Sequence, residues 1–247
     1  MTSSEDTVIE IRNLGLRYGA FQALSDINET VLRKECVVLC GPSGSGKSSL
    51  LRCINGLLKF QEGDIFVDGV SVRGWKNLST LRLKIGLVFQ QFALYPHMTV
   101  LKNIALAPRK VLKQSQAETE KKAKALLDRF GIQDQMHKYP AELSGGQQQR
   151  VAICRALILE PEVLMFDEPT SALDPEMIGE VLEVILGLAR EGITMIVVTH
   201  EMGFARRVAN RIVFMEDGRI IERGTDESFF VKPSNPRTKA FLDKILL

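Results

Sequence analysis

The sequence predicts an α/β fold with a parallel-rich central sheet and flanking helices. Short apolar runs of strand length, such as Cys36–Cys40 and Val163–Phe166, lack alternation, which is typical of parallel strands buried on both faces. Stretches with helical periodicity lie between such runs. A glycine-rich segment, Gly41–Ser48, joins the first run to one of these helical patterns. Strand, loop and helix in this order favour the α/β class.

Further strands are expected near both ends of the chain. Val8–Ile11 alternates between apolar and polar residues, and Asp64–Asp68 ends at a glycine. Thr194–Thr199 is another buried run. Arg211–Met215 and Arg219–Arg223 flank Glu216-Asp217-Gly218, and this pattern predicts a β-hairpin.

Four helices can be placed from their start and stop signals. Ser115 with Glu118 forms a capping-box pattern, and Ala123, Leu126, Leu127 and Phe130 share a helical face before Gly131. A second helix is expected from Ser144 to Glu160, where Pro161 stops it. A third starts with Asp174 as N-cap and Pro175, ends at Gly192, and should bury Val181, Val184, Ile185 and Leu188. The fourth covers about Pro236–Leu247.

Composition narrows the class of protein. The chain has 247 residues, 45% apolar and 25% charged, with a net charge of +2, so a globular protein is expected and a nucleic-acid partner is not. No apolar run approaches the length that a bilayer needs, and the N-terminus lacks a secretory-signal pattern. The four cysteines form no CxxC pair, which favours buried thiols over a zinc site.

The segment Gly41-Pro42-Ser43-Gly44-Ser45-Gly46-Lys47-Ser48 matches the phosphate-binding pattern G-x-x-x-x-G-K-[ST]. Its glycines let backbone N–H groups converge on phosphate oxygens at the positive end of the following helix. Lys47 adds charge at the β and γ positions, and the Ser48 hydroxyl can bind Mg²⁺. The sequence therefore predicts a nucleotide site.

Two acids follow the buried run Val163–Phe166. Asp167 is placed to reach the magnesium side of such a cradle. Glu168 is placed to take a proton from an attacking water, which favours hydrolysis over a simple nucleotide switch.

Leu143-Ser144-Gly145-Gly146-Gln147 is the LSGGQ signature, and with it residues 8–247 resemble the ATP-binding cassette (ABC) family. The motif is a capped helix start and thus a second anion-binding end. The resemblance implies that two cassettes pair head to tail, most simply as a homodimer. Each ATP then lies between the phosphate loop of one subunit and the signature of its partner.

The resemblance also implies further roles. Tyr18 resembles the aromatic residue that stacks on adenine, Gln90 the glutamine that senses metal and water, and Ser171–Asp174 the D-loop. His200 resembles the switch histidine near the γ-phosphate. Expected catalytic residues are Glu168, His200 and Gln90, and expected magnesium ligands are Ser48, Gln90 and Asp167. Expected nucleotide contacts are Tyr18, Gly41–Ser48, Ser49, Ser144–Gln147 and Asp174.

The same resemblance implies a single domain, P-loop NTPase in fold. Residues 1–90 and 160–247 would form a RecA-like core with an N-terminal antiparallel β subdomain, and about 91–159 the Q-loop and helical signature subdomain. Phe92, Leu94 and Tyr95 would dock against a membrane permease.

Several segments are similar to the polar amino acid uptake subgroup, for example FQQFALYPHMTV at 89–100 and NPRTKAFLDKIL at 235–246. Lys59-Phe60-Gln61 and Cys154 depart from that pattern. The expected assembly comprises a second cassette, a permease and, indirectly, an extracytoplasmic solute-binding protein, at the cytoplasmic face of the cell membrane.

Alternatives remain: a cassette for another solute or for export, a DNA-repair or translation ATPase, or a P-loop kinase or regulator. Only 95 positions separate Ser48 from Leu143, too few for the long coiled coils of repair ATPases, and the chain holds one cassette where translation factors carry two. The signature and Glu168 argue against a kinase.

Overall fold

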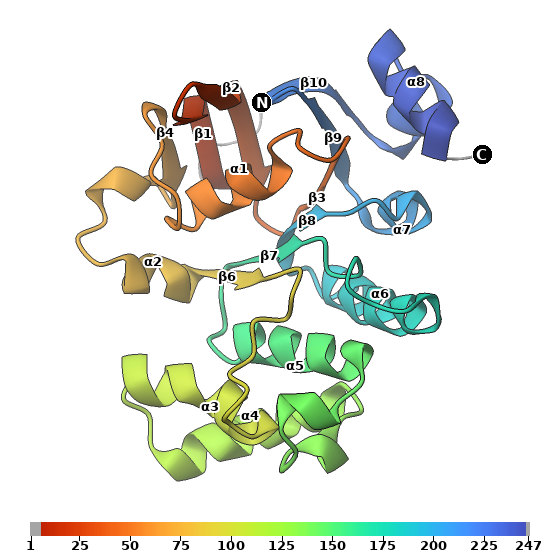
Figure 1. The fold of residues 1–247 in the computed structure, drawn as a ribbon. Helices are drawn as coiled ribbons and strands as arrows, with labels where there is room; N and C mark the ends of the chain where they lie inside the picture. Colours follow the sequence, from red (N-terminus) through yellow and green to blue (C-terminus); the bar gives the residue numbers. More distant parts are fainter. Residues whose placement is uncertain (1–5, 246–247) are drawn as a thin grey trace. The chain divides into compact units, whose positions relative to one another are not determined.

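The computed structural model describes residues 6–245, which form two compact units (Figure 1). Unit 1 contains residues 6–82 and 189–245, and unit 2 contains residues 83–188. The domain boundaries expected from the resemblance, 91 and 159, stay a prediction.

Unit 1 carries an antiparallel sheet and a set of mostly parallel strands. The antiparallel sheet has the order β2-β1-β4-β5, and the other strands the order β10-β9-β3-β8. The strands are β1 (Thr7–Tyr18), β2 (Phe21–Leu32), β3 (Cys36–Cys40), β4 (Glu62–Val67), β5 (Val70–Ser71), β8 (Thr194–Val198), β9 (Arg211–Glu216) and β10 (Arg219–Gly224). The helices are α1 (Lys47–Ile54), α2 (Leu78–Lys84, which leads into unit 2), α7 (Met202–Val208) and α8 (Pro236–Ile245).

The strand register brings two loops of unit 1 to one edge. β3 runs parallel to β8, with Leu39 opposite Val198, and every residue of both strands is buried. Because the carboxyl ends of neighbouring parallel strands meet at the same edge, the loop that begins at Gly41 and the residue His200 leave the sheet side by side.

The predicted β-hairpin is confirmed. β9 pairs with β10 antiparallel, with Arg219 opposite Glu216. The two turn residues, Asp217 and Gly218, have φ of 48° and 72°, as a two-residue type I′ turn requires. The same β9 is parallel to β3.

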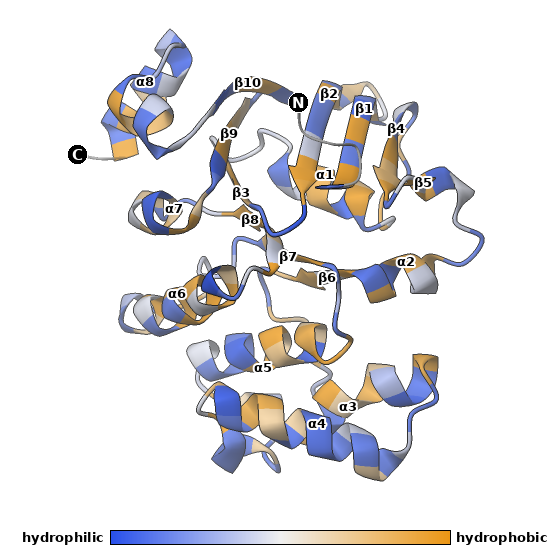
Figure 2. Ribbon diagram, turned by 180° about the vertical axis from the view of Figure 1, so that it is seen from behind, coloured by the Kyte–Doolittle hydropathy of each residue, from blue (hydrophilic) through white to orange (hydrophobic). Residues whose placement is uncertain are grey.

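Unit 2 contains two parallel strands and a cluster of helices. β6 (Ile85–Val88) pairs with β7 (Val163–Asp167), with Val88 opposite Phe166. The helices α3 (Val100–Val111), α4 (Gln116–Arg129) and α5 (Gly145–Leu157) pack on one another, and α6 (Pro175–Arg190) follows β7. Figure 2 shows α4 with alternating hydrophobic and hydrophilic stretches, as expected of a helix with one face buried.

Most helix predictions hold, with two corrections. Ser115 caps α4 as predicted, since its hydroxyl accepts from Glu118 N. The helix predicted to reach Glu160 ends at Leu157, and Glu160 adopts a left-handed φ of 52°. On α6, Leu186 is buried where Val184 was expected, since Val184 is only half-buried. The end of the predicted C-terminal helix, 246–247, lies outside the described residues.

The burial of the cysteines and the hydropathy of the helices bear on the chemistry and the class of the protein. All four cysteines are buried, and burial raises the pKa of each thiol to about 12. Within residues 6–245, no helix has both the length and the apolar character needed to cross a bilayer.

Candidate functional site

The glycine-rich loop of unit 1 closes around its own lysine. Lys47 is buried, and its Nζ donates to the carbonyl oxygens of Gly41 at 2.9 Å and Pro42 at 2.8 Å. A longer contact, 3.4 Å, reaches the Ser45 hydroxyl. The ammonium charge is thus held inside the curve of the loop at the start of α1, where the helix dipole is positive. Loop curvature and charge fit a polyphosphate.

Close backbone packing explains two loop glycines. A Cβ on Gly41 would lie 2.0 Å from the Met215 carbonyl oxygen on β9, and one on Gly46 would lie 2.7 Å from the Ala23 carbonyl oxygen. Both glycines also have positive φ, 143° and 98°. A side chain at either position would therefore push the loop off its support.

The tip and end of the loop are more open. Ser43 and Gly44 are exposed, whereas Ser48 and Ser49 are half-buried at the start of α1. Tyr18, at the end of β1, is 47% exposed, and its hydroxyl lies 3.4 Å from the Ser49 hydroxyl. The Tyr18 hydroxyl therefore lies beside the start of α1, directly after the phosphate loop, within unit 1.

His200 is exposed directly after Thr199, whose backbone N–H donates to the Leu39 carbonyl at 3.3 Å. Unit 1 thus carries the phosphate loop between β3 and α1, Tyr18 at the end of β1 and His200 after β8.

Unit 2 brings together the acids and the glutamine. Asp167 is the last residue of β7 and is buried, while Gln90 is exposed in the turn after β6. Because β6 and β7 are parallel neighbours, Gln90, Asp167 and Glu168 lie at the same edge. Glu168 has a φ of 48°, an uncommon conformation for a residue other than glycine, and such residues cluster at functional sites.

The turn after Glu168 is fixed by Ser171. The Ser171 hydroxyl donates to the Glu168 carbonyl at 3.0 Å, and the Ser171 N–H points at the same oxygen at 3.3 Å. These bonds hold the Glu168 backbone in its left-handed conformation.

Two residues that sequence reasoning missed hold the loop after Gln90. Arg155 on α5 donates to the carbonyls of Phe92 at 3.0 Å and Ala93 at 2.7 Å. The buried Asn103 on α3 accepts from Tyr95 N and donates to the carbonyl of Tyr95. Burial lowers the pKa of Arg155, although the side chain is satisfied by these carbonyls. No sequence pattern marks either residue, because their partners are backbone atoms.

The apolar residues of the loop after Gln90 are neither fully buried nor fully exposed. Phe92 and Leu94 are half-buried, and Tyr95 is 44% exposed. His97 and His137 both lie in turns.

The signature begins α5 with a reciprocal cap. The Ser144 hydroxyl accepts from Gln147 N at 3.3 Å, and the Gln147 side chain accepts from Ser144 N at 3.0 Å. Gly146 N points at the Met177 sulfur at 3.4 Å. The Gln147 N–H is thus taken up by the predicted Ser144 cap, and the Gly146 N–H points at a sulfur of the same unit. Sulfur is a weak acceptor, so a phosphate oxygen could displace it.

The D-loop packs against the signature glycines. A Cβ on Gly145 would approach the Leu173 side chain at 3.0 Å, and one on Gly146 would approach Met177 at 3.3 Å. Asp174 is exposed, and its carbonyl accepts from Met177 N at 2.9 Å at the start of α6. Met177 is a third residue that the sequence analysis did not single out.

The donor chemistry also fits magnesium. Ser48, Gln90 and Asp167 offer a hydroxyl, an amide and a carboxylate oxygen, all hard ligands of the kind that Mg²⁺ prefers. Residues 6–245 contain no cluster of three or more His, Cys, Asp or Glu able to hold a metal ion. Magnesium in nucleotide sites needs only one or two protein ligands besides phosphate and water.

Comparisons with known proteins show the family of this chain. A family profile described as ABC transporter matches residues 24–171. The chain is 53% identical to the glutamate/aspartate import ATP-binding protein GltL of Escherichia coli strain K12, over 97% of this chain and 100% of that protein. It is 57% identical to the glutamine transport ATP-binding protein GlnQ of Geobacillus stearothermophilus, over 93% and 95% of the two chains.

Solved structures share the fold. A dimeric, post-hydrolysis state of the ATP-binding cassette MJ0796 bound to ADP and Pi has a TM-score of 0.79 at 34% identity, covering 88% of this chain and 98% of that one. CbiO1 of Clostridium perfringens, part of the ABC transporter complex cbiONQ, has a TM-score of 0.82 at 31% identity, covering 97% and 100%. The chain therefore belongs to the ABC transporter family, as an ATP-binding cassette with ATPase activity.

Proposed function

We propose that this chain hydrolyses ATP to power the import of polar amino acids through a separate membrane permease. The observation that carries the ATPase part is the closed glycine loop with Lys47 held inside it at the start of α1. The amino acid part is supported by the relatives GltL and GlnQ, whose names specify glutamate/aspartate import and glutamine transport.

The nucleotide is held mainly by unit 1. Gly41–Ser48 would surround the phosphates through backbone N–H groups and Lys47, and Tyr18 would stack on adenine beside Ser49. Ser48, Asp167 and Gln90 would hold Mg²⁺. When bound, Mg²⁺ neutralises charge on the β- and γ-phosphate oxygens.

Hydrolysis depends on residues that follow buried strands. Glu168 would accept a proton from the attacking water, and its left-handed backbone, fixed by Ser171, holds the carboxylate in one direction. His200, exposed at the end of β8, would position the γ-phosphate or the water.

The signature would act in a partner subunit. Ser144–Gln147 and Asp174 would complete the ATP site of the second cassette in a homodimer, an arrangement supported by the dimeric MJ0796 structures. The chain would act peripherally at the cytoplasmic face of the cell membrane. Its partners would be permease subunits and, indirectly, an extracytoplasmic solute-binding protein, with no role for nucleic acid.

The ATPase proposal is tested with Glu168→Gln in the presence of MgATP. Loss of the base should slow hydrolysis by about 10²–10⁴-fold and leave a stable dimer that retains unhydrolysed ATP. Size-exclusion chromatography with light scattering, followed by nucleotide analysis, measures both effects.

Glu160→Gln is the matched control, since Glu160 is a glutamate of unit 2 that also has a positive φ, 52°. It should stay active and should not trap a dimer. A monomeric, fully active Glu168→Gln protein would refute the role of Glu168.

The cargo is tested by uptake of radiolabelled glutamate, aspartate and glutamine in cells with and without the gene. Uptake of at least one should fall to background and return with the wild-type gene but not with Glu168→Gln. Unchanged uptake of all polar amino acids would refute the proposed cargo. Co-purification of the permease from the same cells identifies its subunits.

A further inference from the structure

The turn of the β9–β10 hairpin contacts the backbone of the phosphate loop. Gly218 N donates to the Ser45 carbonyl at 3.2 Å, and Ser25 N donates to the Gly218 carbonyl at 2.8 Å. The Met215 carbonyl is the atom that a Cβ on Gly41 would strike. Any movement of this turn therefore moves the backbone that surrounds Lys47.

Helix α8 fastens the same hairpin at its tip. Arg237 makes a two-pronged ion pair with Glu216, the last residue of β9, through Nε to Oε2 at 2.8 Å and through Nη2 to Oε1. The side chain of Arg237 is 65% exposed, but that of Glu216 only 13%. Hydrogen bonds and the charge of Arg237 lower the pKa of Glu216, so the pair is charged at neutral pH.

Two further contacts keep α8 in place. Glu222 on β10 is buried and accepts from Ser234 N, from the Ser234 hydroxyl, both at 2.7 Å, and from Asn235 N at 3.2 Å. The rings of Phe214 on β9 and Phe241 on α8 lie 4.9 Å apart. α8 is therefore fixed to both strands of the hairpin.

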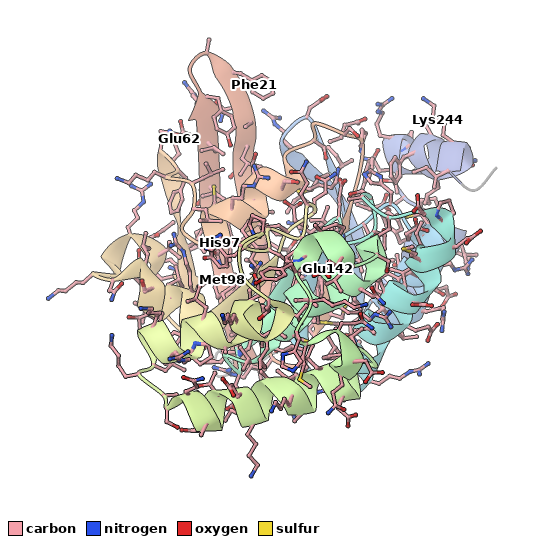
Figure 3. All side chains as sticks on the ribbon, turned by 60° about the horizontal axis from the view of Figure 1, so that its bottom comes forward. Phe21, Glu62, His97, Met98, Glu142 and Lys244 are labelled. Atoms are coloured by element: carbon pink, nitrogen blue, oxygen red, sulfur yellow. The ribbon has the colours of Figure 1, made fainter. Side chains whose placement is uncertain are left out.

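The contact between α8 and the loop itself is loose by comparison. A cavity of about 220 Å³ is lined by Pro42 of the loop, Glu216 of β9, and Arg237, Ala240, Phe241 and Lys244 of α8. Figure 3 labels Lys244 on this helix, at the upper right of that view. α8 is thus connected to the phosphate loop mainly through the turn of the β9–β10 hairpin, and not through tight packing of α8 on the loop itself.

We propose that Arg237 is a positioning residue for nucleotide binding, which acts through Glu216 and the Asp217–Gly218 turn to hold the phosphate loop in its closed curve. This rests on the proposed function, in which that loop binds ATP. α8 (Pro236–Ile245) lies outside the residues 24–171 that the family profile matches, as does the β9–β10 hairpin that it contacts.

This role of Arg237 is tested by MgATP binding to the purified chain, with calorimetry for affinity and circular dichroism for folding. Arg237→Ala removes both prongs and leaves the Glu216 carboxylate without its guanidinium. MgATP affinity should weaken by about three- to fivefold, the upper range for one exposed ion pair. The melting temperature at pH 7 should fall only slightly, by no more than in the control variant Arg12→Ala. Arg237→Lys keeps the positive charge but can make only one of the two contacts with Glu216. Its MgATP affinity should lie between those of the wild type and Arg237→Ala.

Arg12→Ala is the matched control, because Arg12 makes the same two-pronged pair with Glu10, both contacts at 2.8 Å, on a strand of the same unit. It should bind MgATP like the wild type. ATPase rates should show the loss in KM for ATP and not in kcat, whereas a general loss of stability would lower the active fraction and hence kcat.

Arg237→Ala with wild-type affinity would overturn the proposal, whatever its melting temperature. If that variant is partly unfolded, Arg237→Lys decides: weakened binding by a fully folded protein supports the positioning role, and unchanged binding overturns it. Lys47→Ala separates the two proposals, since wild-type MgATP affinity in that variant would refute the loop as the ATP site itself.

Discussion

The two units build their parts of the site by different means. In unit 1 the phosphate loop is shaped by backbone atoms, because Gly41, Gly46 and Gly218 each lie where a Cβ would meet a carbonyl oxygen at 2.7 Å or less. In unit 2 the functional residues stand on strand ends and turns that side chains hold in place. Ser171 fixes the turn at Glu168, and Arg155 and Asn103 fix the loop after Gln90.

The difference separates binding from chemistry. A backbone cradle with one buried cation can hold a polyphosphate but offers no base to activate water. The strand ends of unit 2 offer carboxylates but no comparable phosphate loop among residues 83–188. Variants of the phosphate loop in unit 1 should therefore change nucleotide affinity, and variants of Glu168 and of the signature in unit 2 should change turnover.

Lys47→Ala should produce the largest effect on binding. It removes the ammonium charge that the Gly41 and Pro42 carbonyls hold inside the loop, so MgATP affinity should fall by about a hundredfold or more. Equilibrium binding by calorimetry measures this. Lys122→Ala is a control, because Lys122 pairs with Glu160 at 3.1 Å on unit 2. Equal affinities for the two variants would contradict the division.

Ser144→Ala should slow turnover without weakening binding to the single chain. Loss of the cap costs about 1 kcal/mol of stability, and loss of the signature hydroxyl should lower the ATPase rate by about tenfold to a hundredfold. Ser115→Ala loses an equivalent cap, since Ser115 accepts from Glu118 N at 3.2 Å on the same unit. If both variants lose activity alike, the effect of Ser144 is one of helix stability only.

Acid should produce the smallest and most local effect. The pKa of Glu216 is lowered in the folded protein by Arg237, so the pair stabilises the fold above the ordinary glutamate pKa of 4.5. This stabilisation is lost as the pH falls below 4.5 through the folded value. The melting temperatures of wild type and Arg237→Ala should differ slightly at pH 7, and the difference should shrink as the pH falls below 4.5. A difference in melting temperature between wild type and Arg237→Ala that does not change with pH would count against the ion pair. When Arg237→Ala is introduced into a Glu216→Gln protein, the difference in melting temperature should not depend on pH in this range.

The sequence was sufficient for elements with strong local signals. The capping pattern at Ser115 and the Asp217-Gly218 turn predicted α4 and the β9–β10 hairpin correctly. The glycine pattern also located the phosphate loop, because each of its features is a local requirement on backbone conformation. The strand ends placed Asp167 and His200 for the same reason.

Elements without such signals were missed. β2 was not predicted, and Asp26 interrupts its pattern with a left-handed φ of 51°. α3 was not predicted either, although Thr99 caps it, because Pro108 lies inside the helix and reads as a breaker. In both cases pairing or packing with distant residues outweighs the local preference.

The amino-acid sequence by itself determined that this chain carries a phosphate loop, two acids after a strand and a capped signature, since these are patterns of neighbouring residues. Only the tertiary structure decided that the Met215 carbonyl lies against Gly41, that Met177 faces Gly146 N, and that Arg237 holds Glu216. These partners are separated by many residues along the chain. Their meeting depends on strand register and helix packing, which no local pattern encodes.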